Sequence, residues 1–426
     1  MSSPPKAWTA PHAAGPLHAV VSLPGSKSLT NRALVLAALA EGASRIRRPL
    51  RSRDTELMAA ALRVLGIEVR DDGDDWVVTG EPGVLSPVGS AIDVGNAGTV
   101  ARFLPPLAAL AKTAVTFDGD LAMRRRPLAP VLVALRSLGA DLSSIDGLPV
   151  TVRGSGSLAG GVVALDASQS SQFVSALLLS APRFSQGIAV RHEGTRLPSL
   201  PHIAMTVDAL RAAGARVDDT LAGTWRVDPG PLLPRDAVVE PDLSTAAAYL
   251  AAPLVAGGSV TVDGWPLGTR QPGAVLPDVL ERMGALVSRH PTAVTVSAGD
   301  GLRGIDIDLA DAPELTMVLT ALAALADSPS QFRGVPHLRV QETDRLAALS
   351  SEINALGGDV RETEDGLTVT PRRLRGGLMH SYDDHRVAMA WAVLGLGVEG
   401  IQVDDIGTTR KTVPDFVGSW SQMMGA

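Results

Sequence analysis

The stretch Leu135–Ala140 reads Leu-Arg-Ser-Leu-Gly-Ala, and variants of this short phrase recur along the whole chain. Each variant has a helix end bearing leucine, methionine or small residues, then a glycine, a small or apolar residue and a strand-forming segment. The glycines are Gly66, Gly139, Gly214, Gly284 and Gly357, separated by 73, 75, 70 and 73 residues, with a last echo at Gly425. A glycine directly after an amphipathic helix is typical of a left-handed helix end. The spacing predicts six repeats of about 71 residues.

Each repeat also opens with a second, more apolar helix that is followed by a strand, as at 32–39, 175–180 and 246–252. The sixth repeat stops at its Gly-Ala and lacks the trailing strand, whereas 18–23 is a spare strand before the first repeat. We expect this spare strand to complete the sixth repeat. The N-terminal domain is then 24–240 and the C-terminal domain 1–23 plus 241–426, each with three repeats.

The amino-acid composition excludes several classes of function. The 426 residues are 45% hydrophobic and 19% charged, which is ordinary for a globular protein. Without cysteine, disulfides, thiolate metal sites and cysteine nucleophiles are excluded. A net charge of −7 and 3% aromatic residues argue against nucleic acid as a partner. The longest apolar runs, 315–326 and 387–398, are too short to span a membrane and predict buried helices. We expect a soluble, cytoplasmic protein.

Polar motifs stand where the apolar helices begin. Residues 24–32 read Pro-Gly-Ser-Lys-Ser-Leu-Thr-Asn-Arg. Small polar residues leave backbone N–H groups available at a helix start, and Lys27 and Arg32 add positive charge, so this segment is typical of an anion site. It is not a Walker loop, because the required glycine spacing is missing. The alternative is an ordinary capped helix start.

Six further motifs occupy a similar phase of the repeats: Gly95–Thr99 with Arg102, Arg124–Pro127, Ser168–Phe173, Gln341–Arg345, Tyr382–Arg386 and Thr408–Thr412. Their arginine and lysine side chains, with helix N-termini, are suited to phosphorylated ligands gathered in one cleft. A basic triplet such as 124–126 alone is usually a solvated face. His380, Asp383, Asp384 and His385 are conceivable metal ligands, but an adjacent arginine and the lack of a further histidine favour no metal.

Taken together, these motifs resemble the 5-enolpyruvylshikimate-3-phosphate synthase family from Leu23 to Phe416. The resemblance implies an α/β fold of two similar domains, each of three βαβαββ repeats, forming inside-out α/β barrels with a double chain crossover. It places the active site in the cleft between the domains. It also implies transfer of the enolpyruvyl group of phosphoenolpyruvate to the 5-hydroxyl of shikimate 3-phosphate through a tetrahedral intermediate, by a monomer without cofactors.

Site residues follow from the resemblance motif by motif. The catalytic residues implied are Lys27, Glu314 and Glu342. Shikimate 3-phosphate would be bound by Lys27, Ser28, Arg32, Ser170, Ser171, Gln172, Ser199, Glu314 and Gln341. Phosphoenolpyruvate would be bound by Lys27, Asn96, Gly98, Arg126, Gln172, Arg345, His385, Arg386 and Lys411. Arginine forks suit carboxylate and phosphate, and lysine suits a point anion or a proton shuttle.

Three positions carry particular expectations. Glu314 stands where most family members have aspartate. The alternative to a catalytic role is that Glu314 is simply a carboxylate at a helix start, beside Pro313. Gln341 replaces a lysine, which predicts weaker binding of shikimate 3-phosphate, and His202 replaces a tyrosine near the substrate ring. Gly98 keeps the family's open position, so we expect inhibition by glyphosate, with partial relief when Gly98 becomes alanine.

Two other functions remain open from the sequence. An enolpyruvyl transferase acting on UDP-N-acetylglucosamine shares the fold, but its common form uses a loop cysteine that this chain lacks. A non-catalytic phosphate-ester binding protein on the same scaffold would not need Lys27, Glu314 and Glu342 together. Phosphate release from purified substrates separates these alternatives.

Overall fold

The computed structural model describes residues 7–425, which divide into two compact units. The N-terminal unit is Gly25–Val239. The C-terminal unit joins the segment that ends at Pro24 to the chain from Glu240 onward. These bounds differ by one residue at each crossing from the predicted 24–240 and 1–23 plus 241–426, of which 1–6 and 426 lie outside the described residues.

The sheets of the N-terminal unit share one pattern. In the second repeat, β6 (Ala91–Asp93) is parallel to β7 (Ala114–Asp118), and β9 (Val150–Arg153) is antiparallel to both β7 and the edge strand β8 (Asp141–Leu142). Helices α3 (Gly98–Ala108) and α5 (Ala129–Ser137), with the short α4 (Leu121–Arg124), complete this repeat, which therefore has the order βαβαββ.

The other two sheets of this unit have the orders β14-β3-β5-β4 and β10-β11-β13-β12. Their strands are β3 (Ala43–Arg47), β4 (Glu68–Asp72), β5 (Asp75–Thr79), β10 (Gly161–Leu165), β11 (Ile188–His192), β12 (Val217–Asp218), β13 (Thr224–Val227) and β14 (Asp236–Val238). Their helices are α1 (Lys27–Leu39), α2 (Arg53–Val64), α6 (Gln172–Ser180) and α7 (Leu200–Ala212).

The C-terminal unit repeats this design with sheets β16-β17-β15-β2, β18-β19-β21-β20 and β1-β23-β22. The strands are β1 (Trp8–Thr9), β2 (Leu17–Ser22), β15 (Gly258–Asp263), β16 (Leu286–His290), β17 (Ala293–Ser297), β18 (Asp306–Asp308), β19 (Ser330–Arg333), β20 (Asp359–Glu362), β21 (Leu367–Thr370), β22 (Gly377–Met379) and β23 (Ile401–Val403). The α-helices are α8 (Ala246–Ala256), α9 (Leu276–Arg282), α10 (Thr316–Leu325), α11 (Arg345–Ala355), α12 (His385–Gly397) and α13 (Phe416–Met424).

The spare strand corrects one prediction. Strand β2 does not complete the sixth repeat; it runs parallel to β15 and completes the sheet of the fourth. The sixth repeat is instead completed by β1, antiparallel to β23. The place that β2 would take beside β3 of the first repeat is filled by β14. Leu17 and Val21 are buried by this exchange, in the core of the C-terminal unit.

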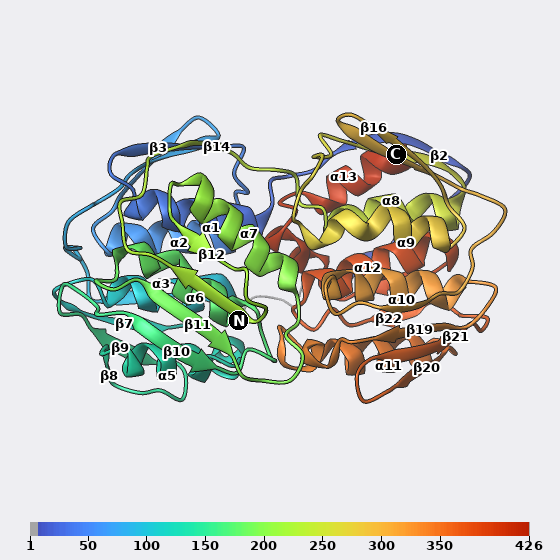
Figure 1. The fold of residues 1–426 in the computed structure, drawn as a ribbon. Helices are drawn as coiled ribbons and strands as arrows, with labels where there is room; N and C mark the ends of the chain where they lie inside the picture. Colours follow the sequence, from blue (N-terminus) through green and yellow to red (C-terminus); the bar gives the residue numbers. More distant parts are fainter. Residues whose placement is uncertain (1–6, 426) are drawn as a thin grey trace. The chain divides into compact units, whose positions relative to one another are not determined.

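Helices form the inside of each unit and sheets the outside (Figure 1). Every residue of α3 is buried, and so are nearly all residues of α6, α10 and α12. The strands bury alternate residues, as in Val150–Arg153, because one face of each sheet meets the helices and the other meets solvent. The predicted inside-out α/β fold is confirmed, and the runs 315–326 and 387–398 are the buried helices expected.

The glycines that define the repeat adopt the predicted backbone. Gly66, Gly139, Gly214, Gly284 and Gly357 all have φ between +89° and +103°. At Gly284 a Cβ would lie 2.1 Å from the carbonyl oxygen of Gly301, so both the angle and the space require glycine.

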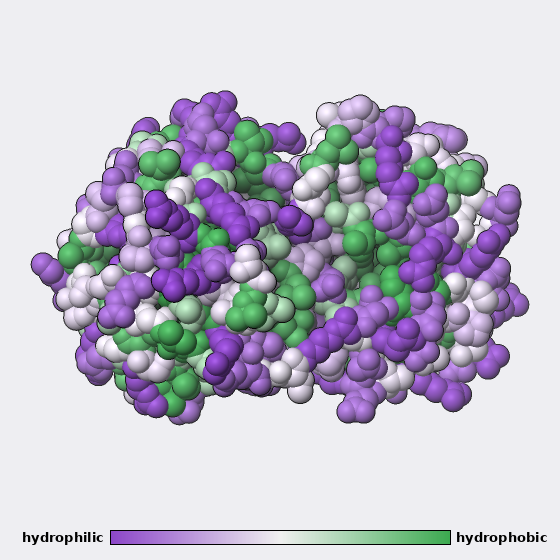
Figure 2. All heavy atoms as spheres, in the orientation of Figure 1, coloured by the Kyte–Doolittle hydropathy of each residue, from purple (hydrophilic) through white to green (hydrophobic). Residues whose placement is uncertain are grey.

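Hydrophilic residues are spread over the face of each unit in Figure 2, with hydrophobic ones among them. The large apolar side chains are concentrated inside, in one hydrophobic core per unit. None of the helices described, over residues 7–425, combines the length and apolar character needed to cross a membrane.

Candidate active site

Lys27 opens helix α1 and pairs with a carboxylate from the next helix. Its Nζ lies 3.3 Å from Oδ2 of Asp54, and the two side chains are only 15% and 5% exposed. Asp54 lies in the first turn of α2, where a negative charge also suits the helix dipole. The pair holds an ammonium group at the start of α1, where the sequence predicts an anion site. Asp54 was not predicted, because nothing local in the sequence links it to Lys27.

Arg32 is buried among side chains of its own unit. Its guanidinium donates to Oγ1 of Thr206 at 2.8 Å, to the carbonyls of Ser28 and His202 at 2.9 Å each, and to Oγ of Ser175 at 3.4 Å. Burial lowers its pKa to about 9. These contacts use four of the five N–H groups that an arginine carries. Arg32 therefore ties α1 to α6 and α7, and one of its five N–H groups takes no part in these contacts.

Arg126 turns back onto the start of α3. Its Nη1 donates to the carbonyl oxygen of Asn96 at 3.0 Å and to Oδ1 of Asn96 at 3.2 Å. Arg124 instead forms an ion pair with Asp118, and both it and Arg125 are exposed. Only one member of the basic triplet therefore joins the other predicted site residues. The triplet does not open a helix, since Pro127 precedes the first residue of α5 by two positions.

Arg102 lies close to Arg126. It belongs to the motif Gly95–Thr99 with Arg102, but no role in the site was predicted for it from the sequence. It is 3% exposed, and its Nη1 donates to Oε1 of Gln172 at 2.9 Å. Burial, and then the charge of Arg126, lower its pKa well below the ordinary value. The two arginines flank Gly98, where a Cβ would lie 2.6 Å from Nη1 of Arg102 and 2.8 Å from Nη2 of Arg126.

The predicted serines all stand at helix starts. Ser171 is the buried N-cap residue of α6, and Oγ of Ser170 accepts from the backbone N–H of Gln172 at 3.3 Å. Ser199 is the N-cap residue of α7 and has φ +54°, a left-handed conformation that is uncommon for serine. Ser28 lies in the first turn of α1. These hydroxyl groups suit a polyhydroxylated or phosphorylated ligand.

In the C-terminal unit, Glu342 lies between two groups that can carry positive charge. Its Oε1 is 3.0 Å from Nζ of Lys411, and its Oε2 is 3.2 Å from Nδ1 of His385. The three side chains are 8%, 12% and 1% exposed, respectively for Glu342, Lys411 and His385. Lys411 ends a 3-10 helix (Ile406–Lys411) rather than opening an α-helix, which corrects the expectation for that motif.

Arg345 and Asp384 form a buried ion pair beside this triad. Nε of Arg345 lies 2.7 Å from Oδ2 of Asp384, with 3% and 0% of the side chains exposed. Burial lowers the pKa of Arg345, but the charges of Asp384, Glu342 and Glu314 outweigh it and raise the pKa overall. For Asp384, burial raises the pKa, but the charge of Arg345 and its hydrogen bond outweigh burial and lower the pKa overall, so the carboxyl stays ionised. Gln341 also accepts a hydrogen bond from Nη1 of Arg345.

Besides its ion pair with Arg345, Asp384 is the N-cap residue of α12. Its Oδ1 accepts from the backbone N–H of Arg386 at 2.9 Å, which fixes the first turn that carries His385 and Arg386. From the sequence, Asp384 was considered only as a conceivable metal ligand and was not predicted to support the substrate site.

Glu314 lies in a 3-10 turn (Pro313–Leu315) that leads into α10, close enough to His337 and Arg345 to shift their pKa values. Burial lowers the pKa of His337 to about 4, against the opposing charge of Glu314. Its Nε2 is buried without a hydrogen-bond partner. Nothing in the sequence marked this histidine, which lies in another 3-10 turn (Pro336–Val340).

Glu342, Asp384 and His385 place possible ligand atoms within 4.8 Å of one another, the arrangement that a metal ion would use. Both carboxylates are already paired with cations, Glu342 with Lys411 and Asp384 with Arg345. A cation would have to displace these ammonium and guanidinium groups, so we assign no metal to the cluster.

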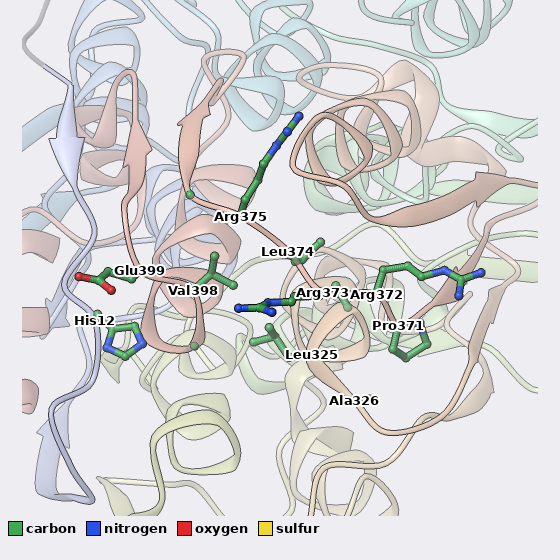
Figure 3. Close-up of a pocket in the computed structure, with 13 residues that line it drawn as sticks. His12, Leu325, Ala326, Pro371, Arg372, Arg373, Leu374, Arg375, Val398 and Glu399 are labelled. Atoms are coloured by element: carbon green, nitrogen blue, oxygen red, sulfur yellow. The ribbon is translucent and has the colours of Figure 1, made fainter.

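A pocket of about 750 Å³ lies at the C-terminal ends of α10 and α12, whereas His385 lies at the start of α12. Three arginines of the β21–β22 connection line it. Arg372 pairs with Asp359 at 3.4 Å, and Arg375 donates to the carbonyl of Ala355 at 3.4 Å. Figure 3 shows Arg373 between Leu325 and Val398, and Arg375 pointing away. None of the predicted site residues is among those lining this pocket.

The six-repeat arrangement of two similar units is the fold of the enolpyruvyl transferases. The chain resembles the enolpyruvyl transferase NikO from Streptomyces tendae (19% identity, TM-score 0.76, covering 97% of this chain and 96% of that one). It also resembles EPSP synthase from Acinetobacter baumannii in two structures. One has 24% identity and TM-score 0.81, covering 98% and 97% of the two chains; the other has 23% and 0.80, covering 97% of each.

These likenesses show the fold, and the sequence itself decides the family. Residues 11–420 match the profile described as EPSP synthase (3-phosphoshikimate 1-carboxyvinyltransferase). The chain belongs to the EPSP synthase family, and its activity is 3-phosphoshikimate 1-carboxyvinyl transfer. The predicted function is therefore confirmed, and the alternative acceptor UDP-N-acetylglucosamine is not favoured.

Proposed function

We propose that the two groups of side chains described above, one in each unit, bind one pair of substrates and carry out this transfer together. The observation that carries the proposal is the placement of Glu342, held between Lys411 at 3.0 Å and His385 at 3.2 Å beside the Arg345–Asp384 pair. Such a carboxylate has proton-donating and proton-accepting neighbours, as acid–base chemistry at an anionic substrate requires.

We propose that phosphoenolpyruvate is held by guanidinium and ammonium groups. It carries a carboxylate and a phosphate, and planar guanidinium forks match both. The N-terminal unit would contribute Lys27, Asn96, Gly98, Arg126 and Gln172, and the C-terminal unit Arg345, His385, Arg386 and Lys411. Arg102 would act through Gln172, because its Nη1 donates to that amide oxygen and leaves the Gln172 NH₂ group to face a ligand.

We propose that shikimate 3-phosphate is held chiefly by hydroxyl groups and by helix starts. Ser28, Ser170, Ser171, Gln172 and Ser199 lie at the starts of α1, α6 and α7, where backbone N–H groups favour an anion. Lys27 would add a full positive charge, and Arg32 the one N–H that its internal contacts leave. Glu314 and Gln341 would complete this set from the C-terminal unit.

The proposed chemistry moves two protons. Glu314 accepts the proton of the 5-hydroxyl as its oxygen bonds to C2 of phosphoenolpyruvate, while Glu342 delivers a proton to the C3 methylene. The tetrahedral ketal phosphate then loses a proton from C3 to Glu342, and the C2–O bond to phosphate breaks. Inorganic phosphate leaves with the proton that Glu314 took from the hydroxyl, and the enolpyruvyl ether remains. Lys27 and Lys411 balance the charge that builds up on the phosphate oxygens.

One experiment tests the proposal directly. The purified enzyme is given phosphoenolpyruvate with shikimate 3-phosphate, and inorganic phosphate and the enolpyruvyl ether are measured together. We expect both products in equal amounts, and none when UDP-N-acetylglucosamine replaces shikimate 3-phosphate. Binding of both substrates without release of phosphate would instead indicate the non-catalytic phosphate-ester binding protein.

We propose that the enzyme acts in the cytoplasm, because both substrates are phosphorylated metabolites that do not cross membranes unaided. We also propose that it is a monomer. Sedimentation of the purified protein at several concentrations checks the monomer, and a dimer that persists on dilution would contradict it.

A further inference from the structure

The loop His380–Asp384, which leads from β22 into α12, has a backbone that its side chains disfavour. Tyr382 and Asp383 are consecutive left-handed residues, with φ +55° and +57°. This region is uncommon for residues other than glycine, and a bulky residue such as tyrosine is a real outlier there. Such backbone persists only where surrounding contacts hold it, and it concentrates at functional sites. The loop ends on Asp384, the cap of the helix turn that presents His385 and Arg386.

Glu352 supplies contacts that hold this loop. Its side chain is buried on α11, 6% exposed. Oε2 accepts from the backbone N–H of His380 at 2.9 Å, and Oε1 accepts from the hydroxyl of Tyr382 at 2.6 Å. One carboxylate therefore binds the loop both at its first residue and through the side chain of its first left-handed residue.

The same helix holds the loop at a second point. Arg345 begins α11, and Glu352 stands seven residues later, on the same face two turns along. Arg345 pairs with Asp384 at 2.7 Å. Helix α11 thus binds both ends of the loop, and one of these contacts uses an arginine proposed to bind phosphoenolpyruvate.

The segment between β23 and the 3-10 helix Ile406–Lys411 also holds the loop. Asp404, just before the 3-10 helix that ends at Lys411, accepts from the backbone N–H of Ser381 at 2.8 Å and lies 3.0 Å from Nδ1 of His380. The indole N–H of Trp391 donates to the carbonyl of His380 at 3.0 Å. The loop therefore connects the elements that carry Arg345, His385 with Arg386, and Lys411.

We propose that Glu352 is a positioning residue for phosphoenolpyruvate binding: by holding Tyr382 and Asp383 in their left-handed conformation, it sets the first turn of α12 and thus the direction of His385 and Arg386. This inference rests on the proposed roles of His385 and Arg386. Tyr382 is 40% exposed, so its hydroxyl bond serves the shape of the loop rather than the packing of the core.

The test compares Glu352→Ala, Glu352→Gln and Tyr382→Phe with the unchanged enzyme, by steady-state kinetics with each substrate varied in turn. We expect Glu352→Ala to raise the KM for phosphoenolpyruvate about tenfold and to leave the KM for shikimate 3-phosphate within about twofold. The reason is that His385 and Arg386 would no longer be held in the orientation that binds phosphoenolpyruvate. Glu352→Gln keeps one acceptor and should show a smaller increase. Tyr382→Phe should raise the same KM by about threefold, and combining it with Glu352→Ala should add little.

Glu364→Ala is the matched control, since this glutamate is exposed between β20 and β21 of the same repeat. It should leave both KM values unchanged. The thermal midpoint of each variant is measured alongside; if Glu352→Ala does not fold, Tyr382→Phe decides the question. A folded Glu352→Ala or Tyr382→Phe with an unchanged KM for phosphoenolpyruvate overturns the proposal, as does an equal rise in both KM values. Arg386→Ala is run in parallel, and its failure to change that KM would count against the proposed site instead.

Discussion

Nζ of Lys411 lies 3.0 Å from Oε1 of Glu342, and the two side chains are 12% and 8% exposed. At such burial an unpaired carboxylate would be costly, so the ammonium group stabilises the ionised form of Glu342. In the proposed site, phosphoenolpyruvate would bring negative charge that competes for Lys411. Its binding would weaken the ion pair and leave Glu342 better able to take up a proton, which the proposed chemistry requires.

Replacing Glu342 by glutamine tests this role. The amide keeps the shape of the side chain but cannot exchange the proton, so we expect kcat to fall on the order of 10³-fold. Binding of shikimate 3-phosphate, measured by calorimetry, should change little. Glu364→Gln, at an exposed position, should retain full activity. A Glu342→Gln enzyme with more than about a tenth of normal turnover would rule out the proton-transfer role.

Gly98→Ala should reduce inhibition by glyphosate, which we expect to compete with phosphoenolpyruvate. The family resemblance implied only that position 98 is kept open by glycine. The structure adds that the alanine methyl group first meets the guanidinium groups of Arg102 and Arg126, at 2.6 and 2.8 Å. Both arginines must move, so the KM for phosphoenolpyruvate should also rise, by several-fold. The inhibition constant and this KM are measured together. An unmodified enzyme that glyphosate does not inhibit would contradict the expectation.

Gln341→Lys should bind shikimate 3-phosphate more tightly, with a KM about fivefold lower, because an ammonium group is restored near the phosphate. Gln341 also accepts a hydrogen bond from Arg345, and lysine has no acceptor. The KM for phosphoenolpyruvate should therefore rise at the same time. Opposite changes in the two KM values are the signature to look for, and Gln341→Glu serves as the control of opposite charge. An unchanged KM for shikimate 3-phosphate disproves the prediction.

His337 should make the protein less stable as the pH falls. Burial lowers its pKa to about 4, from 6.5. Between these values the unfolded chain binds a proton that the folded chain does not, so stability is lost as pH falls from 6.5 toward 4, by about 3 kcal/mol. His337→Asn should remove this part of the pH dependence, measured by urea unfolding from pH 7 to 4. His290→Asn, at an exposed position, should leave the wild-type slope unchanged; the same slope in both variants would refute the assignment.

The exchange of β2 into the C-terminal unit can be tested with two neighbouring valines. Val21 is 7% exposed within the core, whereas Val20 is 70% exposed on the same strand. Val21→Ala should cost about 2 kcal/mol of unfolding free energy, and Val20→Ala less than about 0.5. Urea unfolding measures both. Equal effects of the two substitutions would show that the strand does not pack as described.

Local patterns accounted for much of the fold. The glycines at about 71-residue intervals all have positive φ, because a helix that ends before a strand needs a left-handed residue whichever partners it later meets. The apolar runs became α10 and α12 for a similar reason, since a helix apolar on every side has to be buried. The exchange of β2 and β14 was missed, because two parallel strands of similar pattern can fill the same sheet edge.

The sequence by itself determined the repeat, most of the helix starts, the family and the types of side chain available to bind two anions. Only the tertiary structure decided that Asp54 pairs with Lys27, that Arg102 holds Gln172, and that Glu352 holds the loop before α12. These contacts join residues between 27 and 70 positions apart, as in Lys27–Asp54 and Arg102–Gln172. Periodicity and capping act within a few turns of one helix, whereas a buried charge takes whichever partner packing brings within reach.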